Sequence, residues 1–93
     1  MSPMIYVELT IINKLGLHAR AAAKLASTAG KYGCTIKTGR KPDKLVDAKS
    51  VMSLMLLAAS QGTTLYFQFE GNDAKRAHQD IEQLIENRFD EEQ

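Results

Sequence analysis

With 93 residues, the chain is long enough for one compact domain with a single modest hydrophobic core. Its net charge of +1 argues against a dedicated nucleic-acid-binding protein. Cys34 is the only cysteine, so an intrachain disulfide is excluded. The N-terminus does not resemble a signal peptide, and the longest apolar run, residues 54–59, is too short to cross a membrane. We therefore expect a cytoplasmic protein.

The charges are unevenly distributed along the chain. Residues 1–62 contain nine Lys and Arg against three Asp and Glu, whereas acidic residues outnumber basic ones in residues 63–93. A basic surface on the first part favours a partner with an acidic docking face.

The first 31 residues combine a strand, a tight connection and a helix. Residues 4–12 alternate with a period of two, which predicts a strand with Ile5, Val7, Leu9 and Ile11 on its buried face. Residues 13–17 contain Gly16 and lead into an alanine-rich helix from His18 to about Lys31. The expected buried stripe of this helix is Ala22, Leu25, Ala26 and Ala29.

The rest of the chain continues the alternation of strands and helices. We predict strands over residues 34–38, 45–48 and 63–70, a turn over 39–43, helices over 51–60 and 74–85, and a frayed acidic tail over 90–93. Cys34 should be a buried small hydrophobe instead of a reactive thiol. The order β-α-β-β-α-β-α predicts one sheet with helices on one face, although the pattern does not fix the strand order.

His18 stands where the loop becomes a helix. The unpaired amides and the positive end of the helix dipole at such a position attract anions. Arg20 adds a planar guanidinium that can bind two phosphate oxygens. The combination predicts a place where a phosphoryl group rests on a histidine. Spacing alone also fits an ordinary surface histidine, and His78, which has no such surroundings, is expected to be structural.

Ser50 precedes the apolar run 51–60 and is a natural N-cap for that helix. The helix carries more large apolar residues than one core face needs. We expect Leu54, Leu57 and Ala58 to point inward, and an adaptable docking patch of Val51, Met52 and Met55 to remain partly exposed. The alternative is that these residues fill gaps in the core, and for Met55 the two interpretations are nearly equal.

Two stretches resemble the signatures of a known family. Residues 13–20, Asn-Lys-Leu-Gly-Leu-His-Ala-Arg, resemble the phosphorylation site of the HPr family, the histidine phosphocarriers of the bacterial phosphoenolpyruvate-dependent phosphotransferase system. Residues 47–55 resemble the family's second signature, around a regulatory serine. The resemblance implies an α+β open-faced β-sandwich spanning residues 1–93 as one domain, with a four-stranded antiparallel sheet covered on one face by three helices.

The same resemblance implies roles and partners. His18 would accept a phosphoryl group at Nδ1 from phosphorylated enzyme I and pass it to an enzyme IIA-type acceptor, with Arg20 stabilising the phosphate. Ser50 would be a site for a dedicated HPr kinase/phosphorylase. Partner-binding residues would be Leu17, Lys24, Lys49, Val51, Met52 and Met55, with Leu17 also holding the loop and Lys24 solvated.

The chain lacks a P-loop, a metal-ligand cluster and a nucleotide-binding glycine loop, so no cofactor or metal is expected. We accordingly expect a monomeric carrier that relies on its partners' catalytic groups. Ala21 departs from the family, where proline often follows the arginine and stiffens the turn.

The alanine-rich first helix and the acidic ending 89–92 look like the nitrogen-related NPr branch. Three alternatives remain: a sugar-type HPr, a non-phosphorylated HPr-like binding module and, least favoured, a self-contained enzyme.

Overall fold

The computed structural model describes residues 3–93. The elements follow the order β1 (Met4–Thr10), α1 (Ala19–Gly30), β2 (Thr35–Lys41), β3 (Lys44–Asp47), α2 (Val51–Leu56), β4 (Thr64–Glu70), α3 (Ala74–Glu86) and a short 3₁₀ helix, η1 (Arg88–Asp90). This order confirms the predicted alternation. No helix in the described part of the chain is long and apolar enough to cross a membrane.

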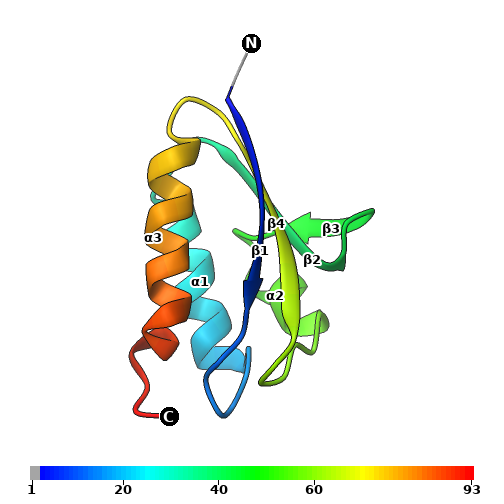
Figure 1. Ribbon diagram of the computed structural model, residues 1–93, viewed down its shortest axis with the longest axis vertical. Helices are drawn as coiled ribbons and strands as arrows, with labels where there is room; N and C mark the ends of the chain where they lie inside the picture. The colour runs from blue at the N-terminus through cyan, green and yellow to red at the C-terminus, as the bar shows by residue number, and fades with distance from the viewer. Residues whose placement is uncertain (1–2) are drawn as a thin grey trace.

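The four strands form one antiparallel sheet in the order β1-β4-β2-β3. β4 is therefore central, pairing Phe69 with Ile5 of β1 on one side and with Ile36 of β2 on the other. The helices lie on one side of the sheet, and α1 and α3 lie next to each other (Figure 1). The open-faced α+β sandwich is confirmed.

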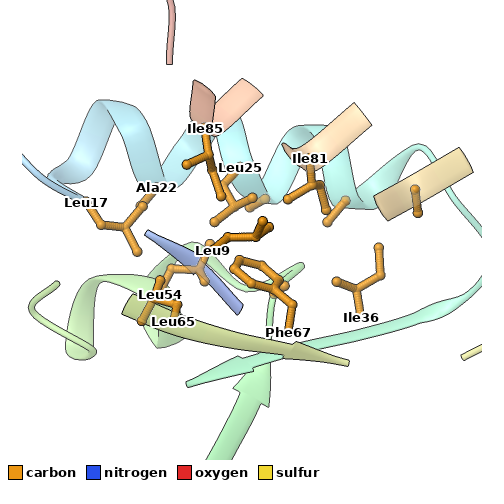
Figure 2. Close-up of a cluster of buried hydrophobic side chains, with 14 of the residues drawn as sticks. Leu9, Leu17, Ala22, Leu25, Ile36, Leu54, Leu65, Phe67, Ile81 and Ile85 are labelled. Carbon is orange, nitrogen blue, oxygen red and sulfur yellow. The ribbon is translucent and has the colours of Figure 1, made fainter. Parts of the chain in front are cut away.

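The core lies between the helices and the covered face of the sheet, where apolar side chains from both layers meet (Figure 2). The period-two pattern of β4 buries Leu65, Phe67 and Phe69 as predicted. On α1 the predicted stripe is buried, and its alanines let the helix approach the sheet closely. The core thus fixes α1, whose N-terminal end carries His18.

The predicted ends of the first two strands are wrong. β1 ends at Thr10 instead of Ile12. β2 continues to Lys41, which leaves only residues 42–43 for the predicted turn over 39–43. The register between β2 and β3 shifts around Gly39, where an added Cβ would lie 2.1 Å from the carbonyl oxygen of Lys44. Glycine permits this irregular pairing, and a glycine in a strand is easily mistaken for part of a turn.

The helix predicted over 51–60 ends at Leu56. Ala58 follows in a left-handed conformation with φ of 51° and is exposed, so its predicted inward position is wrong. Ala59 is buried in its place, whereas Leu57 is half-buried. Beyond this early end, the Ala59 carbonyl accepts a hydrogen bond from the Leu17 amide in the loop before α1.

Candidate functional site: the N-terminus of α1 and the C-terminal tail

The loop before α1 is held from two sides. Within the loop, the Gly16 amide donates to the Asn13 carbonyl at 3.1 Å. Across it, the Leu17 amide donates to the Ala59 carbonyl at 2.8 Å. Gly16 has φ of +70°, and a Cβ at this position would lie 2.6 Å from the Ala59 oxygen. The loop therefore requires glycine at position 16 and orients the residue after Leu17.

His18 is the N-cap of α1, with extended backbone and no side-chain capping hydrogen bond. Its side chain is 28% exposed. The first helical amide with a backbone acceptor is that of Ala22, which donates to the His18 carbonyl. Helix geometry leaves the three preceding amides without intrahelical acceptors. The predicted junction of a histidine with free helix amides is present.

Arg20 is exposed and, among residues 3–93, forms no ion pair. Together with Lys14, His18 and Glu91 it lines an open cavity of about 360 Å³. A cation in the first turn of a helix opposes the helix dipole unless an anion is nearby. The structure therefore leaves a free guanidinium beside the imidazole.

The C-terminal tail contacts the histidine directly. Glu91 Oε2 lies against His18 Nε2, and Glu91 Oε1 accepts a hydrogen bond from Asn13 Nδ2 at 3.0 Å. Desolvation by itself would raise the pKa of Glu91, but the hydrogen bonds from Asn13 and His18 and the charges of His18 and Arg20 outweigh it, so the pKa is lowered. Glu91 is therefore ionised beside the imidazole at neutral pH.

The prediction of a frayed acidic tail is wrong. Phe89 is buried, and its carbonyl accepts a hydrogen bond from Lys24 Nζ at 2.8 Å. The Lys14 amide donates to the carbonyl oxygen of Gln93 at 2.8 Å. In Figure 1 the red C-terminal segment passes the end of α3 and approaches the start of α1. Lys24, expected to be solvated, is instead one of the groups that hold the tail.

Ser50 caps α2 as predicted, because its Oγ accepts a hydrogen bond from the Ser53 amide at 3.2 Å. Val51, Met52 and Met55 are exposed, and Met52 reaches 74%. Leu56, which the sequence analysis did not single out, is 82% exposed. The segment that follows α2 contacts the loop before His18, so this apolar surface lies on an element adjacent to the site.

Besides Lys24, two of the residues expected to bind partners have internal contacts. Leu17 is only 5% exposed, so it holds the loop from the core and offers almost no surface to a partner. Lys49 is half-buried, and its Nζ donates to the Tyr32 carbonyl at 2.8 Å. His78 lies on α3 with its ring centroid 5.5 Å from that of Phe69 in the core.

Asn13 and Glu91 are the site residues that sequence reasoning missed. Asn13 is fully buried and donates both to Glu91 and, at 2.8 Å, to the Gly16 carbonyl. A polar residue directly after an apolar strand was the available signal for Asn13. Glu91 had no comparable signal, because it stands in an acidic run typical of a solvated terminus.

Comparison with known proteins assigns the chain to a family. A family model described as "PTS HPr component phosphorylation site" matches residues 5–87. Phosphocarrier protein HPr of Pseudomonas aeruginosa is 53% identical over 85 residues, covering 91% of this chain and 94% of the relative. Phosphocarrier protein NPr of Shewanella violacea is 42% identical over 84 residues, covering 90% of this chain and 91% of the relative.

Solved structures agree with this assignment. HPr-C-His from Thermoanaerobacter tengcongensis matches with a TM-score of 0.88 and 42% identity, covering 96% of this chain and 99% of that chain. A phosphocarrier protein HPr from Bacillus anthracis matches with a TM-score of 0.81 and 32% identity, covering 88% of this chain and 96% of that chain. The sequence matches and the shared fold together identify the chain as a member of the HPr family of phosphocarrier proteins of the phosphotransferase system.

Proposed function

We propose that His18 accepts a phosphoryl group from phosphorylated enzyme I and transfers it to an enzyme IIA-type acceptor. Proteins of the HPr family interact with partners of these two kinds. The observation that carries the proposal is the position of His18, which is partly exposed at the open N-terminus of α1 beside an unpaired Arg20.

In the proposed transfer, the lone pair of His18 Nδ1 attacks phosphorus. The N–P bond forms as the bond to the donor breaks, and the donor keeps the electron pair of that bond. The free amides at the start of α1 and the Arg20 guanidinium stabilise the oxygens of the transferred group. In the transfer to the acceptor, a nucleophile of the acceptor attacks phosphorus and the N–P bond breaks, with His18 keeping the electron pair. The chain therefore needs no further catalytic group of its own.

We assign the carrier to the nitrogen-related branch, in the cytoplasm, and as a monomer. The alanine-rich α1 and the acidic ending support this branch. The sugar-type role is the second candidate, favoured by the 53% identity to a relative named HPr against 42% to one named NPr. Donor preference separates the two.

Ser50 is proposed as a regulatory site for an HPr kinase/phosphorylase. A phosphoserine there adds about −1.5 to −2 charges at the N-terminus of α2. Helix amides tolerate this charge, so α2 should stay folded. The added charge lies beside Val51 and Met52, the exposed surface that we propose as a docking patch, and it would repel an acidic partner.

The test is intact-mass measurement after incubation with phosphoenolpyruvate and either a sugar-type or a nitrogen-type enzyme I. We expect one acid-labile phosphate, added faster by the nitrogen-type enzyme. His18→Ala should abolish it, whereas the matched control His78→Gln should retain it. Arg20→Ala should slow the transfer without removing the acceptor.

Two results would contradict the proposal. A folded wild-type chain that gains no phosphate with either enzyme supports the non-phosphorylated binding module instead. A phosphate that persists in His18→Ala places the acceptor elsewhere. Faster phosphorylation by the sugar-type enzyme would leave the proposed carrier function intact and overturn only the assignment to the nitrogen-related branch.

A further inference from the structure

The carboxylate of Glu91 connects a buried asparagine to the candidate phosphoryl acceptor. One of its oxygens contacts His18 Nε2, and the other accepts from Asn13 Nδ2. The Glu91 side chain is 12% exposed, whereas that of its neighbour Asp90 is 65% exposed. This acidic tail therefore places one particular carboxylate against the imidazole.

The backbone on both sides of Glu91 fixes its position. Before it, Phe89 is buried and its carbonyl is bound by Lys24. After it, the Gln93 carbonyl is bound by the Lys14 amide. A carboxylate held at both flanks loses little freedom when it binds the ring, which is the condition under which such a bond orients a side chain.

This contact determines which ring nitrogen carries hydrogen. An ionised carboxylate only accepts hydrogen bonds, so Nε2 must be the donor. Nδ1, which has no hydrogen-bond partner among residues 3–93, then keeps its lone pair in the neutral ring. A neutral imidazole without such a partner distributes its proton between the two nitrogens.

A carboxylate suits this position better than an amide. Asn13 Nδ2 and His18 Nε2 both donate, and each meets a different oxygen of Glu91. Glutamine in the same orientation would offer its oxygen to one of these donors and its NH₂ group, itself a donor, to the other. Asn13 is in turn fixed by its hydrogen bond to the Gly16 carbonyl.

We infer that Glu91 is a positioning residue that holds His18 in its Nε2–H form and so presents Nδ1 to the phosphoryl donor, an inference that rests on the proposed transfer at His18. After transfer to Nδ1, Nε2 still carries its hydrogen, so the contact with Glu91 persists in the phosphorylated protein. The ring then carries a share of positive charge, which the carboxylate stabilises.

The direct test is ¹⁵N NMR of histidine-labelled protein at a pH where the imidazole is neutral. Wild type should show His18 in the Nε2–H form alone. Glu91→Ala should give a mixture of the two forms, and Glu91→Gln should fall between them. Glu92→Ala removes the same charge from the next position, and its His18 should match wild type.

Phosphorylation by enzyme I gives the second readout. Glu91→Ala should slow the reaction by about tenfold, the effect expected from losing one hydrogen bond to a charged group, while Glu92→Ala should stay within about twofold by the same scale. Thermal unfolding followed by circular dichroism checks that both variants are folded.

Three results would overturn the inference: an unchanged His18 form in Glu91→Ala, equal slowing by the Glu91 and Glu92 variants, or faster phosphorylation of Glu91→Ala, which would make the tail a barrier. The failure of the proposed function itself is distinguishable, because wild type would then gain no phosphate while the ¹⁵N spectra could still be read.

Discussion

Replacing Gly16 with alanine tests the geometry that holds His18 in place. Gly16 has φ of +70°, and its added Cβ would lie 2.6 Å from the Ala59 oxygen. Gly62 is a matched control, because it has φ of +91° but nothing within 4 Å of an added Cβ. Both variants would place alanine in a left-handed conformation, but only Gly16→Ala would bring its Cβ into collision with backbone atoms.

The expected loss of unfolding free energy differs accordingly. A left-handed alanine costs about 1–2 kcal/mol, of which about 0.4–1 kcal/mol is offset because alanine restricts the unfolded chain. Gly62→Ala should therefore lose about 1 kcal/mol by these values. Gly16→Ala adds a collision of the kind that costs about 1–3 kcal/mol, for a total of about 2–4 kcal/mol.

Urea unfolding followed by circular dichroism measures the difference. With a slope of about 1 kcal/mol per M, the midpoint should fall by about 1 M in Gly62→Ala and by about 2–4 M in Gly16→Ala. The Gly16 variant should also lose phosphorylation rate, because the shift displaces the Leu17–Ala59 hydrogen bond that precedes His18. Equal midpoints in the two variants would refute the close approach of the loop to Ala59.

Three further predictions concern the rest of the fold. Ser50→Ala should lower the free energy of unfolding by about 1 kcal/mol through loss of the N-cap. Ser53→Ala should leave the cap intact, because Ser53 contributes only its backbone amide to it, and urea unfolding of both variants measures the difference. Hydrogen bonds from the Gly33 amide and then from Cys34 lower the pKa of Asp73. Wild type should therefore have a larger free energy of unfolding than Asp73→Asn at neutral pH, and this difference should disappear as the pH falls through that lowered pKa, which unfolding at a series of pH values measures. Burial raises the pKa of the Cys34 thiol to about 11, so a thiol reagent at mildly alkaline pH should react slowly with folded protein and rapidly in urea; equal rates would contradict the buried position.

Local sequence signals predicted the elements because each buries one face with its own period. The alternation in β4 and the helical stripe of α1 were readable without knowing their partners, since the residues that face the core repeat every second or every third to fourth position. The positions of His18 and Ser50 at helix starts were predictable for the same reason, because the residues on either side of each one mark where a helix begins.

The end of α2 could not be read in this way. Residues 57–60 continue an apolar, helix-forming composition, yet Ala58 adopts a left-handed conformation. After this turn the Ala59 carbonyl accepts a hydrogen bond from the Leu17 amide. A hydrogen bond to a residue about 40 positions earlier leaves no mark on the local pattern.

The position of Glu91 could not be predicted because it depends on the strand order, which the sequence pattern does not fix. β1 and β4 are antiparallel neighbours that pair Met4 with Glu70 and Thr10 with Thr64, so β4 ends where β1 begins. α3 starts at that end and runs back along the sheet (Figure 1). Its 13 residues span about 20 Å at 1.5 Å per residue, close to the length of about 23 Å of the seven-residue strand β1. The chain after α3 therefore reaches the end of β1, where α1 and His18 begin. Once β1 is known to pair with β4, the contact between residues 18 and 91 follows from two element lengths, and without that pairing the acidic ending looks like any solvated terminus.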